Sequence, residues 1–140
     1  MLRTFPFNRI SMGIQTFQET TLKQLQRRHT ADQAIRAFQG CRTAGFQNIS
    51  IDLMYGLPGE TLTSWKKDLK QALSLHPEHI SAYHLIYEEG TTLWQLREQH
   101  KLEEADEDLS VSLFGTLIDS LTAAGYEHYE ISNFCLPGFH

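Results

Sequence analysis

Strand-like and helix-like segments alternate regularly along this chain, and no other feature of the sequence restricts its fold so strongly. Residues 9–15 and 48–55 place apolar side chains at every second position, which is the period of a β-strand. Longer segments with apolar residues three and four apart follow each of them, and residues 79–87 form a third strand-like segment. Strands joined by helices of this length pair in parallel through right-handed crossovers. The sequence therefore predicts an α/β fold.

Local signals mark the ends of the predicted helices. Thr30 and Gln33 form a capping-box sequence before the first long helix, and Gly45 supplies the left-handed residue that ends it. A second amphipathic helix begins near Leu62 and ends before Pro77. The other expected elements are short helices near 22–25 and over 93–100, a long helix over 106–124 and a final strand over 126–131. Three or four strands are too few to close a barrel, so the sheet is either small and open or part of something larger.

Composition and charge limit the range of partners. The 140 residues, 41% hydrophobic and 21% charged, are typical of a single globular domain. The net charge of −5 argues against a nucleic-acid partner, because binding a phosphate backbone requires a concentrated Lys/Arg face. No stretch reaches the ~20 apolar residues of a membrane span, and no signal peptide precedes the first polar run. We therefore expect a cytoplasmic protein.

The cysteines and histidines do not predict a metal site. Cys41 and Cys135 stand far apart, and neither belongs to a C-x-x-C motif. We expect Cys41 to be a small buried residue on a helix and Cys135 to be a loop thiol. The seven histidines lack the spacing of metal ligands, and among them His84 has an interior position because it lies within a strand.

The candidate site is formed by the side chains at the other alternate positions of the strands, most of which are not apolar. In a parallel barrel one parity faces the surrounding helices, the other points inward, and ligands bind at the carboxyl ends of the strands. The inward parity of the first two strands presents Ser11, Gly13, Gln15, Ser50, Asp52 and Met54. Gln15 and Asp52 come late in neighbouring strands, where an amide and a carboxylate suit a ligand with hydroxyl groups, such as a ribose. The pattern is equally compatible with two side chains that satisfy nearby protein groups.

Two connections add charged residues to the same end of the strands. Arg27, in the run 27–29, could form a bidentate pair with a ligand carboxylate, although a solvated surface arginine is the more common outcome. Residues 54–61 (MYGLPGET) lack the lysine of a phosphate loop and predict a tight connection. Glu60 is expected in the first turn of the following helix, where it complements the helix dipole, rather than as a catalytic acid.

Four segments together resemble one protein family. They are residues 8–17 (NRISMGIQTF), 25–29 (LQRRH), 51–61 (IDLMYGLPGET) and 126–134 (YEHYEISNF). In this order, and over nearly the whole chain, they resemble the radical SAM proteins of the oxygen-independent coproporphyrinogen III oxidase-like family. Any one of these segments alone would be a weak signal, whereas the combination is specific.

The resemblance implies a partial TIM-type (β/α) barrel of six parallel strands. Residues 1–105 would hold strands four to six, and residues 106–140 would form a post-barrel helix and strand. The cysteines that hold the [4Fe–4S] cluster in this family belong to the first half of the barrel and are absent from this sequence. Without thiolate ligands the chain cannot hold the cluster, so we expect an inactive fragment.

The resemblance also implies roles for four residues in binding S-adenosylmethionine. Arg27 would pair with the methionine carboxylate, while Gln15 and Asp52 would contact the polar parts of the nucleoside. Ile86 matches a position that packs near the adenine. For Gln15 and Asp52 this implication favours the ligand-binding interpretation over the structural one.

Two functions follow from the resemblance, and a third hypothesis stands outside it. The family contains enzymes that decarboxylate coproporphyrinogen III oxidatively and heme-binding chaperones, and residues 15–17, 27–29 and 129–134 are closer to the chaperone branch. The expected partners are S-adenosylmethionine and a porphyrin or heme. The alternative is an autonomous small α/β binding module without catalysis. A fragment with an open sheet edge is also expected to form homodimers through that edge.

Overall fold

The computed structural model describes residues 9–25 and 27–139, and its centre is a five-stranded sheet in the order β1-β2-β3-β5-β4. The first three strands are parallel, β5 is antiparallel to β3, and β4 is antiparallel to β5. The strands are β1 (Ile10–Gln15), β2 (Ile49–Tyr55), β3 (His79–His84), β4 (Glu127–Glu130) and β5 (Asn133–Cys135). Asn8 and Gln26, which belong to two of the motif segments, lie outside the described residues.

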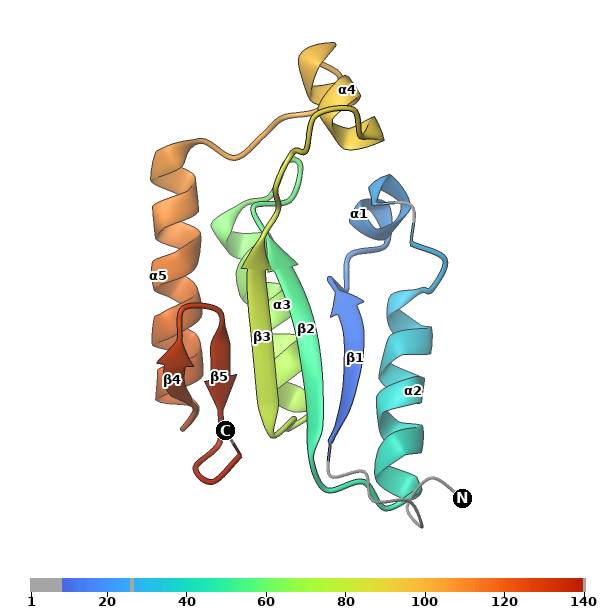
Figure 1. Ribbon diagram of the computed structural model, residues 1–140, viewed down its shortest axis with the longest axis vertical. Helices are drawn as coiled ribbons and strands as arrows, with labels where there is room; N and C mark the ends of the chain where they lie inside the picture. Colours follow the sequence, from blue (N-terminus) through green and yellow to red (C-terminus); the bar gives the residue numbers. More distant parts are fainter. Residues whose placement is uncertain (1–8, 26, 140) are drawn as a thin grey trace.

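Three long helices pack against one face of the sheet (Figure 1). Two short helices lie beyond the carboxyl ends of the parallel strands, at the top of the view. The long helices are α2 (Ala31–Thr43), α3 (Leu62–Ser74) and α5 (Glu107–Ala123), and the short ones are α1 (Glu19–Gln24) and α4 (Thr92–Glu98). In Figure 1 the sheet stands in front of α3, and no helix of the described residues crosses in front of β2 and β3. The sheet therefore has one covered face and one open face.

The core forms between the covered face and the long helices. Ile49, Ile51 and Leu53 of β2 are fully buried there, as their strand periodicity predicts. Trp65 of α3 is fully buried beside them, and its indole N–H donates to the carbonyl of Leu113 in α5 at 3.0 Å. Burial of each such side chain stabilises the fold by about 1.5–3 kcal/mol. These contacts fix α3 and α5 on the sheet.

The predicted helix ends are confirmed, but the C-terminal strands differ from expectation. Thr30 and Gln33 form the reciprocal capping box, and Gly45 adopts φ 100° after α2. The strand expected over 126–131 is present as β4, but the chain then turns back after Glu130 and forms a second short strand, β5, which was not expected. Cys135 is consequently a fully buried residue of β5, and its expected place in a loop was wrong. A three-residue strand is too short to show a period in the sequence.

None of the helices in the described part of the chain is long and apolar enough to cross a lipid bilayer.

Candidate functional site

A row of mostly polar residues crosses the open face of the sheet. Gly13, Asp52, Ser81 and Asn133 are successive Cα partners on β1, β2, β3 and β5. Residues in register on adjacent strands project to the same face, so these four form one line, which we call the polar row. Within it the Ser81 hydroxyl donates to Asn133 Oδ1 at 2.7 Å. The parity expected for Asp52 thus matches the structure.

Gln15 ends β1 in an unusual backbone conformation. Its φ is 71°, in the left-handed region that costs a non-glycine residue about 1–3 kcal/mol, and the register of β1 shifts between Gly13 and Gln15. The conformation turns the side chain back along the strand. The Gln15 amide nitrogen lies 3.3 Å from the point where a Cβ of residue 13 would stand. The absence of a side chain at Gly13 therefore lets the Gln15 amide lie over the polar row, on the β1 side of Asp52.

Interactions on the next residues hold Gln15 in this conformation. Thr16 is completely buried, and its hydroxyl donates to Asp68 of α3 at 2.6 Å. The Phe17 N–H donates to the same carboxylate at 3.1 Å, and His29 Nε2 lies 3.1 Å from the Ile14 carbonyl. Burial raises the pKa of Asp68, and the hydrogen bond from Thr16 partly opposes that rise. Backbone strain persists where its surroundings are fixed in this way, which is typical of ligand-binding positions.

Asp52 is a half-buried carboxylate at the centre of the open face. Burial raises its pKa above the ordinary value. It takes part in none of the ion pairs found among residues 9–25 and 27–139. A carboxylate that is partly desolvated and has no cationic partner there gains from a ligand that donates hydrogen bonds, as ribose hydroxyls do.

Arg27 and Ile86 lie in the connections beyond the strands. Arg27 follows α1 with an exposed side chain, and its N–H donates to the Leu22 carbonyl at 2.9 Å. Ile86 follows β3 and is 73% exposed. The structure thus brings Gln15 and Asp52 to one face, whereas no hydrogen bond or ion pair of the described residues joins Arg27 to either of them.

The buried carboxylate of Glu60 accepts hydrogen bonds from the backbone of the connection after β2. The N–H groups of Gly56 and Leu57 donate to Glu60 Oε1 at 2.8 and 3.3 Å. Burial is the main reason that the pKa of Glu60 rises to about 7, against the opposing effect of these two bonds. Thr61 is the N-cap of α3, so Glu60 precedes the helix, and its expected place in the first turn was wrong.

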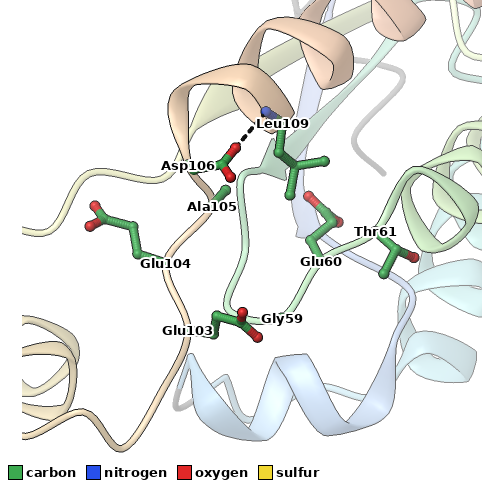
Figure 2. Close-up of a pocket in the computed structure, with 8 residues that line it drawn as sticks. All are labelled: Gly59, Glu60, Thr61, Glu103, Glu104, Ala105, Asp106 and Leu109. Carbon is green, nitrogen blue, oxygen red and sulfur yellow. Dashed lines mark hydrogen bonds between the residues drawn. The ribbon is translucent and has the colours of Figure 1, made fainter.

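Glu60 also lines a small acidic pocket of about 220 Å³ (Figure 2). In this view Glu60 comes from the loop before α3, and Asp106 comes from the start of α5, where its carboxylate accepts from the Leu109 N–H at 2.7 Å. The Gly59 N–H donates to the Glu103 carbonyl at 3.0 Å and joins the two walls. This hydrogen bond therefore holds the loop after β2 against the segment before α5.

His84 supports the same loop from the end of β3. Its Nδ1–H donates to the Leu85 carbonyl at 2.7 Å, and Nε2 lies 2.8 Å from the Ser110 hydroxyl of α5. The imidazole fills the space beside Gly56, where a Cβ would stand 2.4 Å from a ring carbon. The sequence predicts an interior position for His84 but not this contact, because His84 and Gly56 are far apart in the sequence.

Comparison with known proteins identifies the family. The sequence pattern of the Radical SAM superfamily matches residues 1–72, about half of the 140-residue chain.

The chain belongs to the radical SAM superfamily.

Its curated relatives include proteins named heme chaperone HemW. The chain is 41% identical to that of Lactococcus lactis over 132 residues and 36% identical to that of Bacillus subtilis over 138 residues. The matches cover 94% and 99% of this chain but only 35% and 36% of those two relatives. The chain thus spans about a third of the length of these relatives.

A solved radical SAM structure shows the same fold. Coproporphyrinogen III oxidase (HemN) from Escherichia coli superposes with a TM-score of 0.82 at 26% identity, over 98% of this chain and 31% of that one. The expected class, a portion of a TIM-type barrel with parallel strands and alternating helices, is confirmed, as is the resemblance to the coproporphyrinogen oxidase-like family.

The radical SAM family implies S-adenosylmethionine and a [4Fe–4S] cluster in its full-length members. The described residues do not fit the cluster, because they contain no group of three or more His, Cys, Asp or Glu that could hold a metal ion. Cys41 lies on α2 and Cys135 lies in β5. The open face does fit part of S-adenosylmethionine, since it presents the Gln15 amide beside Gly13 and, on the neighbouring strand, the Asp52 carboxylate, which forms no ion pair among the described residues.

Proposed function

We propose that this chain supplies strands four to six of a radical SAM barrel in a protein that handles heme or a porphyrin. In this proposal residues 1–105 are the barrel portion and residues 106–140 begin the region after it. The names of the relatives, heme chaperone and coproporphyrinogen III oxidase, support the ligand class. The superposition over 98% of the chain supports the place in the barrel.

The observation that carries the proposal is the arrangement of Gln15 and Asp52 on the open face. Gln15 and Asp52 would hold the polar groups of the S-adenosylmethionine nucleoside, Arg27 would pair with the methionine carboxylate, and Ile86 would cover the adenine. In the whole protein S-adenosylmethionine would be the source of the organic radical used by the superfamily, and the cluster would supply the electron for its cleavage. The residues of this chain bind and orient it, and the cluster is held elsewhere.

Titration with S-adenosylmethionine, followed by ¹⁵N–¹H NMR of the chain, tests this assignment. Amide shift changes are expected to concentrate around Gln15, Arg27, Asp52 and Ile86. Asp52→Asn should reduce the affinity by about tenfold, because one charged hydrogen-bond acceptor is lost. Glu103→Gln, an exposed carboxylate at the acidic pocket, is the matched control. Shift changes confined to other surfaces, or an unaffected Asp52→Asn variant, would remove the basis for the site.

A heme chaperone is the function we favour for the whole protein. The relatives at 41% and 36% identity carry that name, whereas the solved oxidase is 26% identical. The two functions differ in their preferred tetrapyrrole. A chaperone should bind hemin saturably and more tightly than coproporphyrin III, and an oxidase should show the reverse order. Absorbance titrations of the chain with both compounds separate the two, and the absence of saturable binding of either compound would contradict the ligand class.

A further inference from the structure

A second pocket opens on the same face as the polar row, at its β5 end. It has a volume of about 560 Å³ and is lined by Tyr83 and residues 130–133 of the β4–β5 hairpin. We call it the hairpin groove. Its size lies within the range of about 300–1,000 Å³ that is typical of small-molecule sites. Tyr83 projects to the open face because its register partner is Met54, two residues after Asp52.

The groove exposes two large apolar side chains to solvent. Tyr83 is 47% exposed and Ile131 is 79% exposed, and both are among the exposed large hydrophobic residues of the described chain. Exposed apolar groups that share one concave surface are typical of a binding site, whereas single exposed residues are ordinary. The groove is therefore a candidate for a ligand with a large apolar face.

Hydrogen bonds hold the hairpin wall firmly against β3. The Ala82 N–H donates to the Ser132 carbonyl at 2.8 Å, and His128 Nε2 lies 3.1 Å from the Ile131 carbonyl. The Asn133 amide donates to Glu130 at 2.8 Å while it accepts from the Ser81 hydroxyl. Both backbone and side chains thus fix the turn that presents Ile131. A preformed apolar wall binds with a smaller loss of conformational entropy than a loop that must first become ordered.

Charge defines how a ligand would lie in the groove. Glu130 is the carboxylate among the lining residues, and Asn133 satisfies one of its oxygens. Anionic substituents of a ligand would therefore point away from the hairpin, and its uncharged ring face would meet Tyr83 and Ile131.

We infer that the hairpin groove is the subsite for the flat apolar face of a tetrapyrrole macrocycle, packed between Tyr83 and Ile131. The inference rests on the proposed function, which supplies the ligand class, and adds the surface that receives the ligand. Asp52 and the groove lie on the same open face, and the hydrogen-bonded pair Ser81–Asn133 stands between them. A nucleoside at Asp52 and a macrocycle in the groove would therefore be neighbours.

Titrations of the chain with hemin and with iron-free protoporphyrin IX test the subsite. Ile131→Ser and Tyr83→Ser should each weaken binding of both compounds about tenfold, which is the effect of removing one buried apolar contact. Tyr83→Phe should bind as the unaltered chain does, because it keeps the ring face. Ile131 is mostly exposed on a turn, so its substitution should leave the fold intact, and thermal unfolding checks this.

Val111→Ser is the matched control, since Val111 is 67% exposed on α5, which packs on the covered face. Unchanged affinity in both serine variants would overturn the subsite, and so would a loss in Tyr83→Phe, which would indicate ligation of iron by the hydroxyl. In either case saturable hemin binding by the unaltered chain would leave the proposed function standing. No saturable binding by the unaltered chain would refute the proposed function itself.

Discussion

At the scale of single residues, a strained backbone conformation at Gln15 determines where its side chain lies in the site. Gln15 adopts a left-handed φ of 71° at the end of a strand, and the buried contact between Thr16 and Asp68 keeps it there. An unstrained glutamine would direct its side chain by the ordinary alternation of the strand. The strained one places its amide beside Gly13, whose Cα partner on the neighbouring strand is Asp52.

Gln15→Gly should separate stability from binding. Glycine adopts positive φ without a steric penalty, so the variant should be as stable as the original chain or more stable by up to about 1 kcal/mol. It should nevertheless lose the S-adenosylmethionine-dependent shifts near residue 52. Urea unfolding measures the first effect and NMR titration the second. Marked destabilisation would show that the strain is smaller than the backbone geometry implies.

Glu60→Gln should change how stability depends on pH. Burial raises the pKa of Glu60 to about 7, from an ordinary value of 4.5, so the folded state holds its proton over a range in which the unfolded state loses it. The stabilisation is complete below about pH 4.5 and is lost as the pH rises toward 7, by on the order of 3 kcal/mol. The free energy of unfolding of the wild-type chain, minus that of Glu60→Gln, should therefore fall across this window. A difference that does not vary with pH would mean that Glu60 titrates normally.

At the scale of elements, local signals and long-range contacts differ in how far the sequence reveals them. The capping box of Thr30 and Gln33, the left-handed Gly45 and the parity of β2 could be predicted, because each depends on residues within a few positions. The contact between Thr16 and Asp68 spans 52 positions, so no local pattern announces it. Glu60 lies two residues before Leu62, the first residue of α3, because Thr61 takes the N-cap position. β5 escaped prediction because it is stabilised by pairing with β3.

Two glycine-to-alanine substitutions should have opposite effects on stability. At Gly56, with φ 71°, a Cβ would stand 2.4–2.9 Å from three atoms of the His84 ring, so Gly56→Ala should cost about 2–4 kcal/mol. Gly40 lies within α2 and has no atom within 4 Å of an added Cβ, so Gly40→Ala should stabilise the chain by about 0.5–1 kcal/mol. Urea unfolding of both variants measures the pair. A Gly56→Ala variant as stable as the original would show that the His84 ring is free to move.

At the scale of the whole molecule, an open face and an open edge make self-association an expected property. Within the described residues β1 pairs with β2 alone, which leaves its other edge free to hydrogen-bond. We therefore predict concentration-dependent dimers of the isolated chain, measurable by sedimentation. Ser11→Pro should weaken them, because the Ile10 N–H donates to the Asn48 carbonyl of the β2 side, so the N–H of Ser11 points to the free edge, where proline removes it. A monomer at millimolar concentration would contradict the prediction.

The polar row also depends on the register of the parallel strands. Side chains alternate between faces, so a slip of one residue in β2 would carry Asp52 in among Trp65 and its buried neighbours and would turn Ile51 toward water. An insertion within β2 would impose the same exchange, whereas an insertion in the exposed connection around residues 99–104 would leave every pair unchanged. Length variation in this protein should therefore be tolerated between its elements and eliminated within its parallel strands.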